Sequence, residues 1–393
     1  MQLSDIYGFI SKYEEVLSSA KESLLLYQEI RDKKGEAESL NNTGYARNML
    51  GDYPQALEYY AKSFKIYEEI GDRKGQAASL NNIGKVHSSL GDYPKALEYY
   101  TKSLKIQDGI GNLYGQAYSL NNIGFVHSHL GDYPKELEYY AKSLKIQEEI
   151  GDQRGQAMSL NNIGVVHAQL YDYPKALEYA AKSLNIREKI GDRRGQARSL
   201  NNIGKVHSSL GDYPKALEYC IKSLKIREEI GDRQGQAISH NNIAGVYLEQ
   251  EKYGETRDYL IKAEKIAGEI GAKGYLRKIY ISFAELETGV SNLDAAGNYA
   301  EQSLQLAGEL KSKAGRAEAL LLQARIERSE KKFQEAIAVF EELNQPMETA
   351  KACYYYGRVM TAKGAIDKAR DIFEKIGARG WLAKVDLLMT ECK

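Results

Sequence analysis

Residues 76–115 read QAASLNNIGKVHSSLGDYPKALEYYTKSLKIQDGIGNLYG, and residues 196–235 read QARSLNNIGKVHSSLGDYPKALEYCIKSLKIREEIGDRQG. The two stretches differ at only nine of forty positions. The same pattern returns every 40 residues, in six copies that start near residues 36, 76, 116, 156, 196 and 236. A fixed period of this length is typical of stacked repeats rather than of one globular core.

Each copy contains two predicted helices. In the copy that starts at residue 76, the first helix runs from about Gln76 to Leu90, because apolar and small residues recur there at spacings of three and four. Gly91 interrupts this pattern, and Pro94 follows at a position where the first turn of a helix tolerates a missing N–H. Gly111 ends the second helix, at the place that glycine favours.

The residue pattern of one copy resembles the tetratricopeptide repeat (TPR) signature. The matching positions are Leu80, Gly84, Gly91, Tyr93, Ala96 and Tyr100. The longer unit of 40 residues resembles the repeats of kinesin light chains, of partner-of-inscuteable-type scaffolds and of bacterial regulatory TPR proteins. The resemblance implies an all-α fold, a right-handed TPR superhelix (α-solenoid) of about nine to ten helix pairs with a C-terminal capping helix. His87 and its equivalents depart from the family pattern by replacing a common aromatic residue.

We expect residues 1–393 to form a single TPR solenoid with four sections. Residues 1–35 are predicted to be a degenerate N-terminal pair, in which a short helix from Leu3 to Ile10 precedes a second helix at 13–30. Residues 36–275 hold the six near-identical repeats, residues 276–376 hold three divergent repeats, and residues 377–393 form the capping helix.

Charge and hydropathy argue against several classes of protein. The chain has 54 Lys and Arg against 54 Asp and Glu, whereas a nucleic-acid binder usually carries a basic excess. No apolar run approaches the roughly 18–20 residues that cross a bilayer, and no signal peptide is visible. Three widely spaced cysteines, Cys220, Cys353 and Cys392, suit a reducing compartment. We therefore expect a cytoplasmic protein that binds neither nucleic acid nor membrane.

Residues that resemble catalytic or metal-binding groups have simpler interpretations. His87, His127, His167 and His207 recur every 40 residues, but equivalent residues on stacked helix pairs lie at least a helix diameter apart, about 8–10 Å. Zinc ligands must lie about 2 Å from one ion, so we expect packed imidazoles and no metal. The glycine pairs between helices lack the Gly-Lys-Ser/Thr of a phosphate-binding loop. The sequence predicts no enzyme and no cofactor.

A helical wheel of the first helix separates packing positions from free ones. At 100° per residue, Leu80 and Gly84 fall on one arc, while Ala78, Asn82 and Lys85 lie opposite it. The TPR resemblance implies that first helices line a concave groove, so this opposite face is the predicted ligand surface. Asparagine returns at the Asn82 position in every copy, whereas the two neighbouring positions vary among otherwise similar copies.

The asparagine row has a specific chemical use. A carboxamide offers a donor and an acceptor, so evenly spaced asparagines can pair with the backbone of an extended peptide whatever its side chains. The resemblance supports this, because related TPR proteins hold peptides with a comparable asparagine ladder. The predicted peptide-binding residues are Asn82, Asn122, Asn162, Asn202 and Asn242, together with Lys85, Tyr118, Phe125, Met158, Val165, Arg198 and Lys205.

Other interpretations stay open. Recent duplication alone would leave the asparagines invariant, and the inner asparagines such as Asn81 and Asn121 could bond to adjacent helices instead of a ligand. The leading hypothesis is a protein-interaction scaffold that binds an extended segment of a partner. The alternative is a sensory or regulatory TPR module that controls an effector domain or partner enzyme. Self-association of near-identical repeats is a third possibility.

Overall fold

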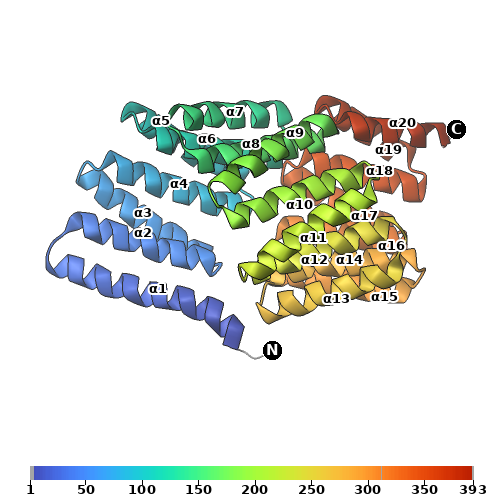
Figure 1. Ribbon diagram of the computed structural model, residues 1–393, viewed down its shortest axis with the longest axis horizontal. Coiled ribbons are helices and arrows are strands. Elements are labelled where there is room, and N and C mark those ends of the chain that lie inside the picture. The colour runs from blue at the N-terminus through green and yellow to red at the C-terminus, as the bar shows by residue number, and fades with distance from the viewer. Residues whose placement is uncertain (1–3, 311, 392–393) are drawn as a thin grey trace. The chain divides into compact units, whose positions relative to one another are not determined.

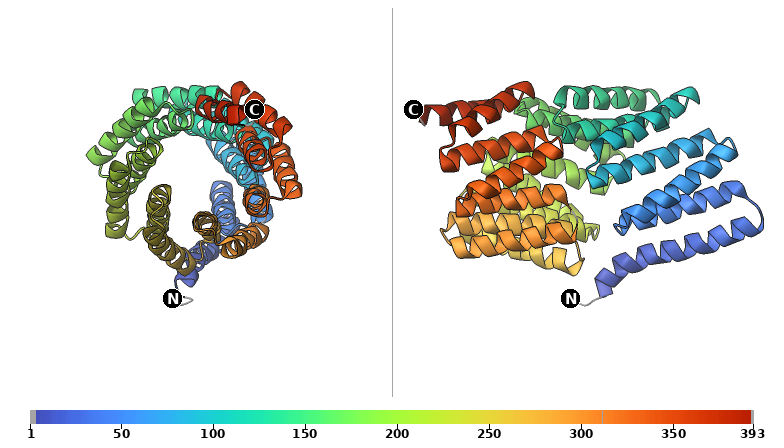
Figure 2. Two further views of the ribbon diagram at one scale, coloured as in Figure 1. Left: turned by 90° about the vertical axis from the view of Figure 1, so that its right-hand side faces the viewer. Right: turned by 180° about the vertical axis from the view of Figure 1, so that it is seen from behind.

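The computed structural model describes residues 4–310 and 312–391, and within them the chain forms twenty α-helices and no strand (Figure 1). The chain divides into two compact units. Unit 1 comprises Met1–His129 and Pro134–Asp152, and unit 2 comprises Leu130–Tyr133 and Gln153–Lys393. Within each unit, consecutive helices lie side by side and run antiparallel (Figure 2). The predicted all-α fold of stacked helix pairs is confirmed.

Unit 1 contains α1 to α6 and nearly all of α7. Their bounds are α1 (Ser4–Glu29), α2 (Lys33–Met49), α3 (Tyr53–Glu69), α4 (Arg73–Leu90), α5 (Tyr93–Gly109), α6 (Leu113–His129) and α7 (Tyr133–Glu149). The even-numbered helices are the first helices of the copies, and each packs on the second helix that follows it.

Unit 2 contains α8 to α20. The near-identical copies give α8 (Gln153–Gln169), α9 (Tyr173–Lys189), α10 (Arg193–Ser209), α11 (Tyr213–Glu229), α12 (Arg233–Glu249) and α13 (Tyr253–Glu269). The divergent copies give α14 (Lys273–Gly289), α15 (Leu293–Glu309), α16 (Lys313–Glu327), α17 (Glu330–Glu342), α18 (Pro346–Met360) and α19 (Lys363–Lys375), followed by α20 (Arg379–Glu391).

The N-terminal segment differs from the prediction. The sequence predicts a short helix and a second helix within residues 1–35, whereas α1 runs as one helix from Ser4 to Glu29. The predicted break falls between Ile10 and Tyr13, where Ser11 and Lys12 are compatible with a helix and neither glycine nor proline interrupts it. Leu3, where the short helix was expected to begin, lies outside the described residues.

An aspartate caps the start of four first helices, α2, α4, α10 and α12. In α4 the side chain of Asp72 accepts a hydrogen bond from the backbone N–H of Gly75, at 2.9 Å. This N-cap lets the helix begin at Arg73, three residues before the predicted start at Gln76. Second helices use the same device with a proline in the first turn, as in α5, where Asp92 accepts from the backbone N–H of Lys95.

A glycine of the first helix and a tyrosine of the second fix the spacing within a copy. A methyl group added at Gly84 of α4 would lie 2.8 Å from the ring of Tyr100 of α5, so the ring packs directly on the glycine backbone. Gly44 meets Tyr60 and Gly124 meets Tyr140 in the same way. Alanine in place of these glycines would force the two helices apart or displace the ring.

The second helices expose a charged surface to solvent. Lys62, Lys102, Lys142, Lys182 and Lys222 each pair with a glutamate one turn earlier at 2.6 Å. Such solvated pairs contribute little to stability, because water screens the charges and two long side chains must be ordered. None of the helices within residues 4–310 and 312–391 combines the length and the apolar character needed to cross a bilayer.

Candidate functional site

The first helices present the face that the helical wheel selects. On α4, Leu80 and Gly84 are buried, Ala78 and Lys85 are exposed, and Asn82 is half-buried. The equivalent positions on α10 behave alike, with Arg198 and Lys205 exposed and Asn202 half-buried. Because the positions of Ala78 and Lys85 vary among the copies while the Asn82 position does not, the exposed face of the first helices is one place where the copies differ in chemistry.

Three of the outer asparagines, Asn82, Asn202 and Asn242, form bonds from one copy to the previous one. The Nδ2 atom of Asn82 donates to Oδ1 of Asn41 at 2.7 Å, and the same bond joins Asn202 to Asn161 at 3.0 Å. Asn242 donates to Asn201 at 2.6 Å. In each case the Oδ1 atom of the outer asparagine accepts no hydrogen bond from the described residues, so its acceptor remains available to a ligand.

Asn122 and Asn162 complete the predicted row, and both are half-buried on first helices. Asn122 departs from the pattern, because the inner asparagine of the previous copy, Asn81, accepts a hydrogen bond from Ser119 instead. The row is thus not uniform in its bonding along the chain.

The inner asparagines are structural. Asn81 is 5% exposed, and its Nδ2 atom donates to Ser119 Oγ of the next copy at 3.0 Å. Ser119 lies 3.3 Å from Ser103 Oγ, which donates to the carbonyl oxygen of Ala77 at 2.9 Å. This chain of hydrogen bonds satisfies buried polar groups and joins consecutive copies, so it accounts for the inner row without a ligand.

The predicted apolar residues fall in different units. Tyr118 and Phe125 are exposed on α6, in unit 1, at 42% and 49%. Met158 and Val165 are half-buried on α8, in unit 2. Each pair supplies apolar surface to the first helices of its own unit, and a continuous patch of all four stays a prediction.

A pocket of about 270 Å³ opens between α8, α9 and α10, entirely within unit 2. Three of the predicted site residues line it, Val165 on α8 and Asn202 and Lys205 on α10. Gly164, Ala176 and Ala180 contribute further apolar lining. The structure therefore brings an asparagine, a lysine and a valine from the predicted set around one cavity.

Ala180 creates this pocket. Three earlier copies carry a tyrosine at the equivalent position, Tyr60, Tyr100 and Tyr140, and each ring packs on a glycine of the first helix. At Gly164 the nearest atoms to an added methyl group are instead the Ala176 carbonyl oxygen, at 3.1 Å, and the Ala180 nitrogen, at 3.4 Å. The space of the tyrosine ring is left open in this copy.

Lys205 lines the pocket, Arg198 lies on the same helix, and the charge of Lys278 acts on the amine of Lys205. Lys205, Arg198 and Lys278 form no ion pair with any residue in the described part of the chain. Lys205 touches solvent, yet enough of unit 2 surrounds it that desolvation lowers the pKa of its amine, and the charges of Lys278 and Arg227 lower it further. A carboxylate brought to this position would relieve both effects.

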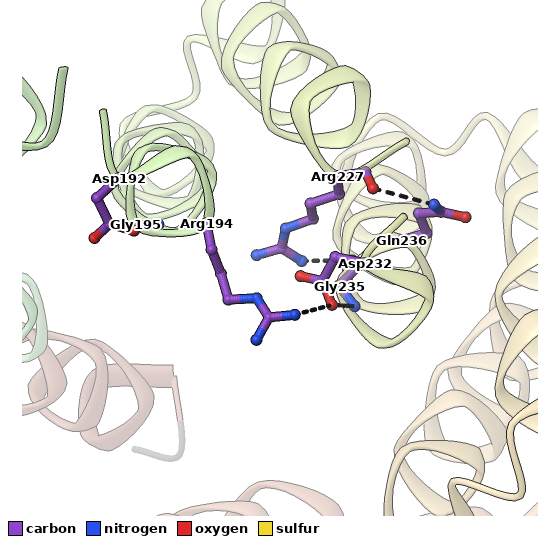
Figure 3. Close-up of polar contacts among 7 residues, drawn as sticks. All are labelled: Asp192, Arg194, Gly195, Arg227, Asp232, Gly235 and Gln236. Carbon is purple, nitrogen blue, oxygen red and sulfur yellow. Dashed lines mark hydrogen bonds and ion pairs between the residues drawn. The ribbon is translucent and has the colours of Figure 1, made fainter. Parts of the chain in front are cut away.

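Two buried arginines lie at the junctions between copies. Arg227, near the end of α11, is 6% exposed and donates to the carbonyl oxygen of Gly235 on α12 at 2.5 Å. Figure 3 shows this contact together with Gln236, whose Nε2 atom donates to the Arg227 carbonyl oxygen at 3.2 Å. Arg194 on α10 reaches Asp232 at 3.8 Å. Burial lowers the pKa of Arg227, and Arg187 makes the equivalent contact with Gly195.

The regularly spaced histidines are packed side chains. His87 stacks on Tyr99 with ring centroids 5.4 Å apart, and His167 stacks on Tyr179 at the same distance. His127 and His207 stack in the same way, on Tyr139 and Tyr219. Among residues 4–310 and 312–391, no group of three His, Cys, Asp or Glu residues lies close enough to hold a metal ion.

Sequence reasoning missed Ala180, Arg187 and Arg227. The signal for Ala180 was present, since it breaks a run of tyrosines at 40-residue spacing. Arg187 and Arg227 likewise stand where earlier copies have Tyr67, Gln107 and Gln147. The helical wheel covers only the first helices, whereas these changes lie on the second helices α9 and α11.

Several solved structures share this fold. A Rap protein complexed with competence and sporulation factor superposes with a TM-score of 0.61 at 13% identity, over 92% of this chain and 100% of that one. Aspartyl phosphate phosphatase F from Bacillus subtilis gives 0.56 at 15% identity, over 89% and 96%. The apo form of the quorum sensor NprR from B. thuringiensis gives 0.53 at 16% identity, over 86% and 98%. At these identities the likeness shows the fold alone.

A comparison with curated protein sequences gives no match. The sequence itself matches the tetratricopeptide repeat family at residues 1–69, 35–108, 115–189 and 195–269, which together make up well over half of the chain. With the helix pairs and the Gly–Tyr packing described above, these matches lead to one conclusion. The chain belongs to the tetratricopeptide repeat family.

Proposed function

We propose that this protein is a non-catalytic scaffold that binds an extended peptide segment of a partner protein along the exposed face of its first helices. The family and the fold support a protein-interaction or regulatory role. The observation that carries the finer proposal is the row of half-buried outer asparagines, among which the Oδ1 atoms of Asn82, Asn202 and Asn242 accept no hydrogen bond from the described residues. Asn202 and Asn242, on α10 and α12, are its clearest members.

The spacing of the row suits an extended chain. First helices of consecutive copies, such as α10 and α12, contact one another, and packed helices lie about 8–10 Å apart. An extended peptide in the polyproline II conformation advances about 3.1 Å per residue and makes one turn in three residues, so one asparagine can meet every third residue of the ligand. Each outer asparagine would accept a backbone N–H of the peptide while its own Nδ2 stays bonded to the previous copy.

The expected affinity is modest. Each hydrogen bond contributes about 0.5–1.5 kcal/mol net, and one or two buried apolar anchors add about 1.5–3 kcal/mol each. Part of this gain is offset by the loss of freedom on association. A dissociation constant in the micromolar range, roughly −8 kcal/mol, follows.

The second candidate is a regulatory module whose peptide ligand controls a partner. It is supported by the neighbours of the same fold, one of which is complexed with competence and sporulation factor and another of which is a quorum sensor. Both candidates place a peptide on the same face. They differ in whether binding changes the activity of another protein.

The test begins with a displayed library of random dodecapeptides selected on the whole chain. The affinity of the enriched peptides is then measured by fluorescence anisotropy for the wild type and for Asn202→Ala with Asn242→Ala. Two lost bonds predict an affinity about 5- to 150-fold weaker. Failure to enrich any peptide would contradict the scaffold, and unchanged affinity in the double variant would contradict the asparagine row.

A control separates binding from folding, because both asparagines also bond to the previous copy. Ser223→Ala removes a buried hydrogen bond to the Ala197 carbonyl oxygen, at 2.7 Å, without touching the exposed face. We expect this variant to lose about 1 kcal/mol of stability and to keep the wild-type affinity.

A further inference from the structure

The pocket between α8, α9 and α10 has the position of a missing side chain. In the copy 116–155, the Cε1 atom of Tyr140 would lie 2.8 Å from a methyl group on Gly124, and the tyrosine is 3% exposed. In the copy 156–195, Ala180 replaces this tyrosine while the glycine is kept as Gly164. The backbone frame that holds an aromatic ring is therefore repeated without the ring.

The walls of the pocket suit an aromatic side chain. Val165 and Ala168 of α8, Ala176 and Ala180 of α9 and Val206 of α10 supply apolar surface, and Gly164 provides a flat backbone floor. The cavity measures about 270 Å³ and is open on one side. An entering ring would exchange water for the same contacts that a tyrosine makes in the sister copies.

The mouth of the pocket is polar and positively charged. Asn202, whose Nδ2 atom is bonded to Asn161, and the amine of Lys205 both border it. Lys205, Arg198 and Lys278 have no carboxylate partner in the described residues. The acidic residues that follow on the same face are already paired, Glu318 with Arg277 at 2.6 Å and Glu285 with Arg325 at 3.7 Å. The unpaired charge around the pocket is thus basic.

We propose that this pocket binds one aromatic side chain, phenylalanine or tyrosine, of an extended acidic peptide that lies along the first helices of unit 2. The ring takes the place that Tyr60, Tyr100 and Tyr140 fill in the three preceding copies. The peptide backbone passes over Asn202, and carboxylates beside the aromatic residue pair with Lys205 and Arg198. This inference rests on the proposed function and specifies the ligand's anchor residue and charge.

The first test uses small probes, namely 4-hydroxyphenylacetate, which carries a ring and a carboxylate, and p-cresol, which carries the ring alone. Binding is followed by saturation-transfer difference NMR with the full chain. We expect the wild type to bind 4-hydroxyphenylacetate more tightly than p-cresol. Ala180→Tyr should weaken both at least 10-fold, and Lys205→Met should remove the preference for the carboxylate and retain p-cresol.

Ala180→Tyr is suited to this test because three sister copies accommodate the same tyrosine, so the variant fills the pocket within a frame that already folds. Circular dichroism and the melting temperature check that it does. Equal binding of the probes to the wild type and to Ala180→Tyr would overturn the proposal. So would a preference of the wild type for isobutyrate, a carboxylate with no ring, over 4-hydroxyphenylacetate.

The second test separates this inference from the proposed function. Peptides enriched on the wild type are expected to contain one aromatic residue flanked by Asp or Glu, and to bind Ala180→Tyr at least 10-fold more weakly. Enriched peptides that show no aromatic preference and bind Ala180→Tyr as well as the wild type would overturn the pocket assignment and leave the scaffold standing. Probe binding without any enriched peptide would overturn both the scaffold and the peptide anchor.

Discussion

The copies at residues 116–155 and 156–195 differ at only eleven of forty positions. Even so, the space between the two helices is filled in the first copy and open in the second. The first fills it with Tyr140 and with the buried carboxyl of Glu136, which is 2% exposed. The second places Ala180 and Ala176 at the same positions and leaves a pocket. The helical frame is the same in both, so a repeat can acquire a binding site by losing a side chain.

This difference has an energetic consequence. A buried aromatic ring stabilises its copy by removing apolar surface from water and by close contact with the glycine opposite it. The copy at 156–195 lacks the stabilisation that such a ring provides. It keeps the polar contacts that join it to the next copy, including the contact between the Oγ atoms of Ser183 and Ser199 at 3.1 Å. A ligand that fills the pocket would restore part of the lost stabilisation.

The largest predicted effect on stability comes from giving the copy at 116–155 the alanine that the copy at 156–195 carries. Tyr140→Ala should destabilise the chain by about 3–5 kcal/mol, the range for removing a buried aromatic ring, because the surrounding helices relax only partly. The reverse change, Ala180→Tyr, should leave stability unchanged or raise it. Chemical denaturation followed by circular dichroism measures both. A loss of stability in Ala180→Tyr as large as that in Tyr140→Ala would show that the two copies do not share one frame.

The second prediction concerns Glu136, which stands where the next copy has Ala176. Burial raises the pKa of its carboxyl to about 8, and the hydroxyls of Ser128 and Tyr140 oppose this shift. The folded chain therefore keeps a proton that the unfolded chain releases near its ordinary pKa of 4.5. The contribution of Glu136 to stability must therefore fall as the pH rises from about 4.5 to about 8, and stay level above and below that window.

Glu136→Ala removes this dependence. At pH 9 we expect the variant to be more stable than the wild type by on the order of 1–3 kcal/mol, since the buried Oε2 atom has no hydrogen-bond partner among the described residues. Near pH 4.5 this ionisation penalty should be absent. Urea midpoints at the two pH values measure the difference, with Glu136→Gln as a control for shape. An equal difference at both pH values would contradict the assignment.

The smallest predicted effect lies on the outer surface, where the two copies agree. Lys142 pairs with Glu138, and Lys182 pairs with Glu178, both at 2.6 Å with the amine 5.4 Å from a tyrosine ring. Lys142→Ala and Lys182→Ala should each cause only a small loss of stability, below that of the two changes above, and the two losses should be equal. Thermal melts of both variants check this prediction. Unequal losses would show that the two copies also differ on their outer surfaces, and not only between their two helices.

Much of the fold could be predicted because the same helix-forming and helix-ending residues recur in each copy. The sequence of one copy predicts its two helices, their order, and the glycine and proline residues at their ends. It also predicts the solvent-facing side of the first helix, which holds Lys85 and Arg198 in their respective copies. The helix α4 starts at Arg73, three residues before the predicted start at Gln76, because Asp72 caps it there. The two helices expected in residues 1–35 are one, because no residue near Ile10 breaks the helix.

The pocket could not be predicted from first helices alone. Its origin is the absence of a ring at Ala180, and the consequence of that absence depends on Gly164 lying opposite it on another helix. The bonding of the asparagines needs distances between copies as well, since Asn202 meets Asn161 and not a residue of its own copy. A helical wheel of one helix shows which amides are exposed. Whether an exposed amide is free to meet a ligand depends on how consecutive copies pack against one another.

The central claim is that a peptide lies on the exposed face of the first helices. A photo-crosslinking residue at Gly245 tests it most directly, because a side chain there meets no atom within 4 Å and shares its face with Asn242. The matched control places the same residue at Lys222, on the solvent side of α11. A labelled peptide selected on the wild type should crosslink at position 245 and not at 222. Crosslinking at 222 with none at 245 would contradict the account.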